Sequence, residues 1–222
     1  MGKNVYDGIM QAANMAVYQD RIYDTDNIKF RLGIVDRISN ANYMAVAVSE
    51  VNYSDGSRMP AVIVSKEDMK ELFEKYDKSE VLPMIRFFLG HEVGHLIDFK
   101  VFPERKWEDI DDLKEIEADI YSVNHNNLSL SEYKKSMDIL CAGMESVYER
   151  TYCGINRFLH KKLYKVFLND RLNKVIAEMG AYHKKEVDTI YEEMAEFLYE
   201  ECQKTKVIQF NQKKNSGGKR NG

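Results

Sequence analysis

The sequence of 222 residues predicts an α+β fold in which helices dominate. Three observations support this class: helical periodicity at the start, a short stretch with a period of two that is rich in β-formers, and helical periodicity over the second half. A chain of this length can bury a core without disulfides or structural metals. Any metal site therefore need not serve to hold the fold together.

The first half of the chain predicts one helix, a small sheet of about three strands and two further helices. Apolar residues at helical spacing indicate a first helix over 5–19. Each expected strand is rich in β-formers and is bounded by Asn, Asp, Gly or Pro. Ser65 and Ser79 are suited to cap the two helices that follow. The expected strands are 30–38, 43–51 and 61–64, and the expected helices are 66–76 and 79–100.

The second half predicts helices alone and ends in a polar tail. Residues 211–222 contain no apolar side chain, so they cannot offset the entropy lost on ordering. We expect a core over 1–128, a helical region over 129–205 and a disordered basic tail over 206–222. The helical region would pack on the core or bind partners, as a lid that selects substrates or as a dimerisation element. Its expected helices, with the one before them, are 110–127, 131–150, 155–180 and 184–205.

Composition excludes several classes of protein. The net charge is −4, but residues 204–222 hold six basic residues and no acidic one, so the remainder carries −10. An acidic body without a basic motif argues against nucleic-acid binding. No apolar run approaches the roughly 18 residues of a membrane span, and the first residues lead into no signal segment. The three cysteines match no disulfide or CxxC pattern, so we expect reduced thiols and a cytoplasmic location. The oligomeric state is not predicted.

Residues 91–95 read His-Glu-Val-Gly-His, inside the helix expected over 79–100. Histidines four residues apart lie one turn apart on the same helix face, so His91 and His95 could bind one tetrahedral Zn²⁺. Glu92 stands beside them and could act on a water molecule. An apolar stripe at positions 89, 93, 96 and 97 would bury the other side of the helix. The alternative is a pair of polar residues that binds no metal.

A second segment, 113–122 (LKEIEADIYS), completes a pattern that resembles the gluzincin branch of the zincin metallopeptidases. Residues 115–121 are similar to the Glu-x-x-Ala-Asp element of membrane-linked gluzincins, and to the matching element of small phage and mobile-element peptidases related to the ImmA/IrrE group. The resemblance covers about residues 60–125. It implies a zincin-like core, a peptide or protein substrate and bound zinc. It also implies Glu115 as the third zinc ligand, with Asp119 hydrogen-bonded to a zinc-bound histidine.

The choice of third ligand is ambiguous between Glu115 and Glu117. The apolar stripe of this helix borders Glu117, so burial alone favours that residue. Glu115 has Asp119 four residues later, where a carboxylate can support a metal-bound histidine, whereas Glu117 has Tyr121 at that place. We expect Glu115 to be the ligand and Glu117 to be a partly buried salt-bridge carboxylate.

These residues together predict a zinc-dependent endopeptidase. Zn²⁺ on the two histidines and Glu115 would lower the pKa of a bound water and polarise a peptide carbonyl. Glu92 would be the general base. The donor that stabilises the oxyanion is not determined. Candidates, each of which could instead be a structural or surface residue, are Tyr121, His125, Tyr152, His160 and His183.

Three further features bear on the site. Gly90 and Gly94 each destabilise a helix by about 1 kcal/mol relative to Ala, which indicates close approach of a backbone or substrate unless they are simply tolerated. The strand over 61–64 is either an edge strand that pairs with an extended peptide or a plain core strand. The acidic residues of 108–112 lack the spacing of a calcium loop, so we expect them to stabilise the start of the next helix.

Two other functions stay open. The ImmA/IrrE resemblance implies a regulatory metalloprotein that acts on one partner such as a repressor. The third possibility is a helical interaction protein whose histidine pair is incidental. Zinc held near one equivalent would exclude the last of these.

Overall fold

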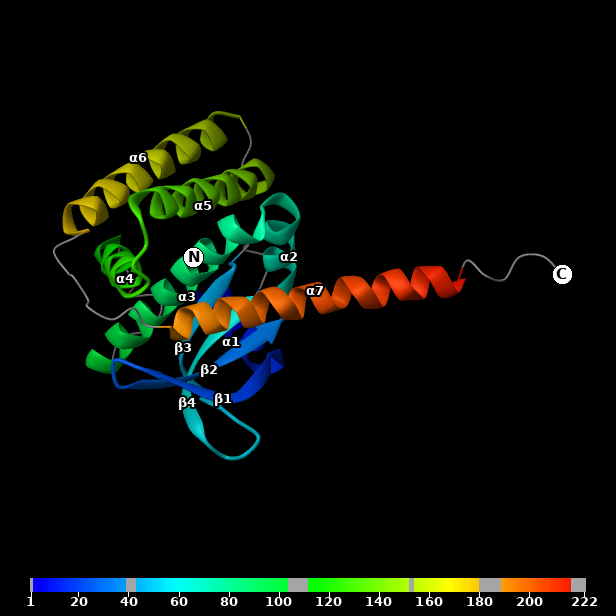
Figure 1. Ribbon diagram of the computed structural model, residues 1–222. Helices are drawn as coiled ribbons and strands as arrows, with labels where there is room; N and C mark the ends of the chain where they lie inside the picture. The colour runs from blue at the N-terminus through cyan, green and yellow to red at the C-terminus, as the bar shows by residue number, and fades with distance from the viewer. Residues whose placement is uncertain (1, 39–42, 104–111, 152–153, 180–188, 217–222) are drawn as a thin grey trace.

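The computed structural model describes residues 2–38, 43–103, 112–151, 154–179 and 189–216, and its class is α+β with helices dominant, as predicted (Figure 1). A small sheet lies on one side of the long helix α3, and the helices α5 and α6 lie on the other. The elements in chain order are α1 Gly2–Met15, β1 Val17–Thr25, β2 Ile28–Val35, β3 Ala45–Asn52, β4 Arg58–Ser65, α2 Lys66–Lys75, α3 Lys78–Val101, α4 Asp112–His125, α5 Leu130–Thr151, α6 Gly154–Glu178 and α7 Ile190–Ser216.

The sheet has four strands in the order β1-β2-β4-β3. β1 and β2 form an antiparallel hairpin whose two turn residues, Asp26 and Asn27, both have positive φ, as a type I′ turn requires. β2 runs parallel to β4, and β3 runs antiparallel to β4. The sequence did not predict β1, and the helix expected over 5–19 ends at Met15 instead. β1 is an edge strand with mostly exposed side chains, so its apolar alternation is weak.

The strand predicted over 61–64 belongs to β4, which lies between β2 and β3. The idea that this segment is an edge strand is therefore wrong, and the alternative of a core strand is correct. The edge strand that contacts α3 is β3. The prediction chose the strand nearest in sequence to the histidine helix. That strand, β4, is central, and β3, which precedes it in the chain, pairs with its outer side and forms the edge of the sheet.

The core lies on both faces of the sheet. Alternate residues of β3 and β4 face α1 on one side and α3 on the other, so Val46 and Ile63 belong to the first cluster while Ala47 and Val62 belong to the second. Because both faces are buried, these strands read as continuous apolar runs rather than as an alternating pattern. The layer between the sheet and the outer helices is where α3 lies.

Capping residues set the starts of the two helices that follow the sheet. Ser65 is the N-cap of α2 and accepts from the backbone N–H of Asp68, as predicted. α3 starts at Lys78 with Asp77 as its N-cap, and the Asp77 N–H donates to Glu80 Oε2 at 3.2 Å. The prediction of Ser79 as the cap is wrong, because Asp77 with Glu80 forms a capping box two residues earlier.

The helices after residue 128 share the main core with those before it. α5 and α7 both pack on α3, and α6 packs on α4 and α5. Tyr133, Leu168, Tyr191 and Met194 are buried in the same cluster as the apolar residues of α3. The expected helical region is thus packed on the zinc-motif helix rather than separate from it.

α7 continues beyond the body of the molecule (Figure 1). It reaches Ser216, whereas the sequence predicted disorder from residue 206. The buried first half of α7 supplies the costly nucleus, and the Lys and Gln residues that follow propagate a helix readily. Residues 217–222 lie outside the described part of the chain.

Two smaller predictions also meet the structure. Cys141 and Cys202 form no disulfide in the part of the chain that the structure describes, and Cys153 lies outside it. Among the helices that the structure describes, each is too short or too polar to cross a membrane.

Candidate metal centre

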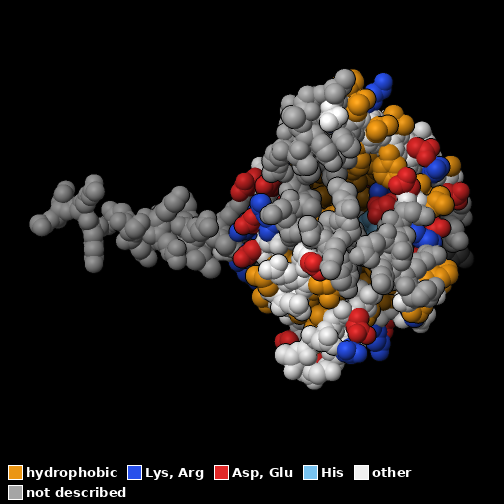
Figure 2. Space-filling view, turned by 180° about the vertical axis from the view of Figure 1, so that it is seen from behind, with side chains coloured by type: hydrophobic (Ala, Val, Ile, Leu, Met, Phe, Trp, Pro, Cys, Tyr) orange, Lys and Arg blue, Asp and Glu red, His pale blue; other side chains and the backbone are white. Residues whose placement is uncertain are grey.

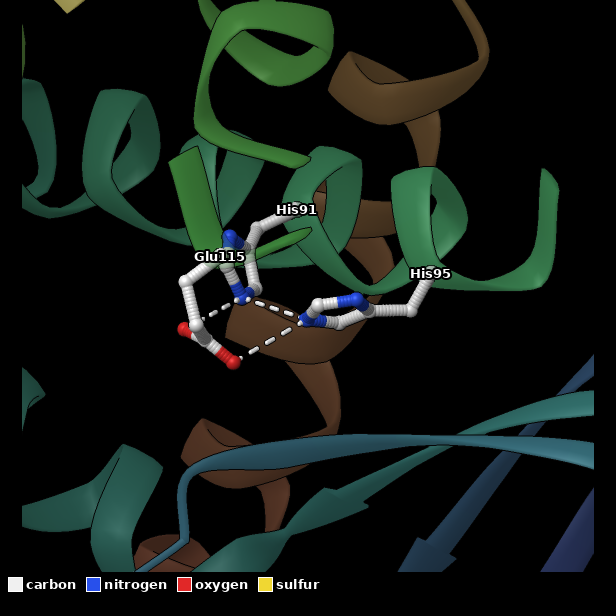
Figure 3. A group of neighbouring side chains, drawn as sticks. All are labelled: His91, His95 and Glu115. Carbon is white, nitrogen blue, oxygen red and sulfur yellow. Dashed lines mark hydrogen bonds and ion pairs between the residues drawn. The ribbon is translucent and has the colours of Figure 1, made fainter. Parts of the chain in front are cut away.

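The two histidines of α3 and one glutamate of α4 converge on a single point (Figure 3). The Nε2 atoms of His91 and His95 are 3.0 Å apart. Glu115 Oε2 is 3.5 Å from His91 Nε2, and Glu115 Oε1 is 3.4 Å from His95 Nε2. Figure 3 shows both rings turning Nε2 toward the carboxylate of Glu115. The three residues expected to bind zinc are therefore brought together.

These separations fit a tetrahedral metal site. Zn²⁺ binds imidazole nitrogens and carboxylate oxygens at about 2.0–2.1 Å, so ligand atoms of one tetrahedron are about 3.3 Å apart. The two histidine nitrogens are 3.0 Å apart, and each lies 3.4 or 3.5 Å from a different oxygen of Glu115, so that one ligand atom from each residue lies within 4.8 Å of the others. A carboxylate and two imidazoles are also a normal donor set for a catalytic zinc, which needs a further open position. The residues present fit the metal that the sequence predicts.

Small residues allow α4 to approach α3 closely enough for this convergence. A Cβ added at Gly94 would lie 2.9 Å from Ala118 Cα, and one added at Gly90 would lie 2.5 Å from Ser122 Oγ. Neither position has room for a larger residue, because the opposing atoms belong to the α4 backbone or to a buried side chain. The close approach expected at these glycines is thus to the backbone of α4. It brings the acidic face of α4 against the histidines.

Asp119 lies behind His91, as the resemblance implied. Its Oδ1 is 2.9 Å from His91 Nδ1, and its side chain is fully buried. A hydrogen bond at Nδ1 fixes the ring and leaves Nε2 directed at a metal. Asp119 therefore orients one of the two histidines.

Glu117 points away from the centre. The expected ion pair is present, with Lys114, but the expectation that Glu117 is partly buried is wrong, because 62% of its side-chain surface is exposed. The burial argument for Glu117 fails because the apolar residues of this helix are not all buried, and Leu113, which begins the stripe, is 60% exposed. The buried face of α4 includes polar residues instead, Asp119 and Ser122 among them. Glu115 is the glutamate that lies beside the histidines.

An arginine that the sequence reasoning missed completes the centre. Arg171 of α6 is 4% exposed and donates from Nη2 to Asp119 Oδ1 at 2.6 Å and from Nη1 to Glu115 Oε2 at 2.8 Å. Its Nε donates to Asp119 Oδ2, which also accepts from the hydroxyl of Tyr133 of α5. No local motif marks Arg171, which stands 52 residues after Asp119. The only sequence signal for a buried charge in α6 is the presence of an arginine in an amphipathic helix.

These contacts shift the pKa values of the buried groups. Burial lowers the pKa of His91, but hydrogen bonds with Asp119 and Glu115 outweigh it and raise the pKa to about 10. Burial raises the pKa of Glu115, but the two histidines and Arg171 hold it well below its usual range. The pKa of Asp119 is likewise lowered, because Arg171 and His91 outweigh burial. These shifts favour a charged cluster in which Glu115 and Asp119 are ionised and His91 is protonated.

Glu92, the expected general base, lies between the centre and the edge strand. Its Oε2 accepts from the backbone N–H of Ala47 in β3 at 2.7 Å. Tyr43, just before β3, is a second residue that the sequence reasoning missed. Burial raises the Tyr43 pKa, and the charges of Glu115 and Glu92 raise it further. Its side chain therefore lies within electrostatic range of both carboxylates.

The expected oxyanion donors on α4 are engaged elsewhere. The Tyr121 hydroxyl donates to Asp26 Oδ2 at 2.7 Å and lies 2.9 Å from the Tyr191 hydroxyl. His125 stacks on Tyr121 and pairs with Asp26 through Nε2 at 2.9 Å. Both residues join α4 to the β1–β2 turn. Tyr152, His183, the side chain of His160 and the acidic residues 108–111 lie outside the described part of the chain.

The centre is partly accessible. The side chain of Glu115 is 30% exposed, while those of His91 and His95 are 10% and 4% exposed. Figure 2 shows a histidine surface at the bottom of a hollow, with acidic and basic side chains beside it. A small ligand could therefore reach the centre from the side of Glu115, the most exposed of the three side chains.

Comparison of the chain with protein-family models, with curated proteins and with solved structures finds no match. The resemblance to gluzincins therefore remains a prediction that depends on residues 91–95 and 115–121.

Proposed function

We propose that the protein is a zinc-dependent peptidase with His91, His95 and Glu115 as metal ligands. The observation that carries the proposal is the convergence of His91, His95 and Glu115 from two helices, with one ligand atom from each lying within 4.8 Å of the others and a buried carboxylate behind one histidine. The charge balance agrees with a divalent ion. With neutral histidines, Glu92, Glu115, Asp119 and Arg171 sum to −2, which one Zn²⁺ would neutralise.

The chemistry divides between the metal and the chain. A bound Zn²⁺ would supply Lewis acidity, which polarises a peptide carbonyl and acidifies water. Glu92 follows His91 on α3 and is well placed to take a proton from the attacking water and to deliver it to the leaving amine. Its hydrogen bond from Ala47 holds the carboxylate near the edge strand, where a peptide would lie.

The edge strand supports an extended peptide as the substrate. The Met44 carbonyl accepts from Ser65 N, so it points inward to β4, and the alternation of an antiparallel strand turns the backbone groups of Ala45 and Ala47 outward, where the Ala47 N–H donates to Glu92. An extended peptide can add to such an edge through main-chain hydrogen bonds, largely regardless of its sequence. The general base would then lie beside the added strand.

We infer Tyr43 as the oxyanion donor in place of Tyr121 and His125, which are engaged with the β1–β2 turn. It lies just before the edge strand β3, and the charges of Glu115 and Glu92 help to raise its pKa, which supports a position near both carboxylates. We expect Tyr43→Phe to lower kcat by about 100-fold and to leave the metal content unchanged, as for loss of one oxyanion donor. Steady-state kinetics with parallel metal analysis measures both quantities.

The proposal is tested by metal content and then by cleavage. We expect the purified chain to hold about one equivalent of Zn²⁺, and His95→Ala to hold none. Wild-type protein incubated with cell extract should generate new peptide N-termini, whereas Glu92→Gln should keep its zinc and generate none. A zinc-free wild-type chain would refute the metal centre. Cleavage that survives in Glu92→Gln would refute the assigned base, and cleavage of a single protein would favour the regulatory alternative.

A further inference from the structure

Arg171 is the charged residue that joins the late helices to the metal centre. It comes from the middle of α6, and its side chain is 5% exposed. Its guanidinium makes a fork with Asp119 through Nε and Nη2 and reaches Glu115 through Nη1. One side chain therefore binds a proposed ligand directly and also binds the residue that orients a second ligand.

The geometry makes Arg171 more than a neutralising charge. A planar guanidinium presents its donors in a fixed arrangement, so it sets the orientation of both carboxylates it binds. Asp119 Oδ1 is then held 2.9 Å from His91 Nδ1, which turns His91 Nε2 toward the centre. Glu115 Oε2 accepts from Nη1 at 2.8 Å, which limits rotation of that carboxylate. A lysine, with a flexible stem and a point charge, could not impose either orientation.

The packing of α5 and α6 depends on the same contacts. α6 packs on α4, and the Tyr133 hydroxyl of α5 donates to Asp119 Oδ2 at 2.9 Å. Tyr133 is fully buried, and Asp119 is fully buried too. A centre formed by α3 and α4 alone would leave two clustered carboxylates without their buried cation.

We propose that Arg171 is a positioning residue of the metal centre, and that through it the docking of α6 on α4 is linked to metal binding. The inference rests on the proposed zinc site but not on peptide hydrolysis. It makes the segment after residue 128 a required part of the centre rather than a detachable lid or dimerisation element.

Metal binding by full-length variants tests the inference without any substrate. Zn²⁺ affinity is measured by competition with a chromophoric chelator, and the geometry of the centre by the visible spectrum of the Co²⁺-loaded protein. We expect Arg171→Gln to weaken Zn²⁺ binding by about 10- to 100-fold and to change the Co²⁺ spectrum. Arg171→Lys keeps the charge and should still weaken binding by about tenfold with a changed spectrum. Lys174→Gln, an exposed position on the same helix, should match the wild type in both measurements.

Two outcomes would overturn the inference. One is an Arg171 variant, folded by circular dichroism, that binds Zn²⁺ within twofold of wild type with the same Co²⁺ spectrum. The other comes from hydrogen exchange on the wild-type chain, which decides the question if both variants fail to fold. Zn²⁺ should slow exchange in α6 as well as in α3 and α4, with α2 as the unaffected reference. If Zn²⁺ leaves hydrogen exchange in α6 unchanged, the docking of α6 is not linked to metal binding.

The proposed function can fail independently of this inference. A chain that binds Zn²⁺ with the expected Arg171 dependence but cleaves no peptide supports the positioning role and refutes the peptidase. A wild-type chain that binds neither Zn²⁺ nor Co²⁺ refutes both proposals.

Discussion

Helix α4 takes part in two histidine–aspartate pairs with the same separation. His91 Nδ1 lies 2.9 Å from Asp119 in the middle of the helix, and His125 Nε2, at the C-terminal end of the helix, lies 2.9 Å from Asp26. The first pair is almost completely buried, with side-chain exposures of 10% and 0%, while the second is exposed by 18% and 40%. The pairs are chemically alike, but their surroundings differ.

The difference lies in what else converges on each pair. His91 turns its second nitrogen toward His95 and Glu115, and Asp119 is bound by Arg171 and Tyr133. His125 uses its other nitrogen for the Tyr121 carbonyl, which is a local contact within α4. Buried charges are costly unless several partners compensate them, so the first pair needs the full cluster, whereas the second is satisfied as a surface contact. A histidine–carboxylate pair indicates a functional site only when further ligands converge on it.

The largest effect should come from removing a proposed ligand. We expect Glu115→Ala to weaken Zn²⁺ binding by more than the roughly 100-fold that loss of a supporting residue can cost. Glu117→Ala is the matched control, because Glu117 lies on the same helix and is mostly exposed. It should bind Zn²⁺ within twofold of wild type. Chelator competition measures both, and loss of zinc from Glu117→Ala would mean that the wrong glutamate has been assigned.

The next largest effect separates the two aspartates. Asp119→Asn should weaken Zn²⁺ binding by about 10- to 100-fold and destabilise the fold by about 3 kcal/mol or more, because buried Arg171 loses a charged partner. Asp26→Asn removes a half-exposed partner of His125 and should cost less than about 1 kcal/mol, with unchanged zinc affinity. Denaturant unfolding of metal-free protein and chelator competition provide the two readouts. Equal behaviour of the two variants would remove the distinction between the pairs.

The response to pH should be the third effect, with opposite signs for the metal-free and the zinc-bound chain. The pKa of His91 in the metal-free protein is about 10, above the value of about 6.5 for an unfolded histidine. The contribution of His91 to the free energy of unfolding is therefore complete below about pH 6.5 and is lost as the pH rises toward 10. The pKa values of Glu115 and Asp119 are lowered, so their contribution is present above about pH 4 and is lost as pH falls. The metal-free centre is thus most stabilising at about pH 4 to 6.5.

Bound zinc should reverse this dependence, because a metal-bound His91 must be neutral. Zn²⁺ affinity should rise about tenfold per pH unit between roughly pH 7 and 9, and each zinc should displace about one proton. Calorimetry in two buffers of different ionisation enthalpy counts that proton. Zinc binding to the Asp26→Asn variant should release the same number of protons as in the wild type. Zinc binding to Asp119→Asn should release fewer protons, because Asp119 helps to raise the pKa of His91. Proton release that is independent of Asp119 would contradict the assignment.

The sequence predicts best those features that depend on local spacing. The side chains of His91 and His95 converge because one helical turn separates them. Ser65 caps α2 by accepting a hydrogen bond from the backbone N–H of Asp68, three residues later. The fold class follows from periodicity in the same way. β1 escaped prediction because an exposed edge strand carries little apolar alternation, although the Asp26-Asn27 turn residues were a usable signal.

The features that were missed depend on tertiary packing. The buried face of α4 includes polar residues that meet Arg171, so hydrophobic periodicity pointed to Glu117 rather than Glu115. Arg171 and Asp119 are 52 residues apart, and no periodic pattern connects them. The pairing order of the sheet likewise placed β3, not β4, at the edge beside α3. Such relations arise only when separate elements are brought together.

The smallest effect should come from the second pair's own neighbour, Tyr121. Tyr121→Phe removes a hydroxyl that donates to Asp26, so the fold should lose about 1 kcal/mol of stability. Peptide hydrolysis should stay within twofold of wild type, because this hydroxyl is committed to the β1–β2 turn and to Tyr191. Unfolding curves and kcat measured on one preparation separate the two effects. A fall in kcat of about 100-fold with zinc retained would instead make Tyr121 an oxyanion donor and would place the outer end of α4 in the active site.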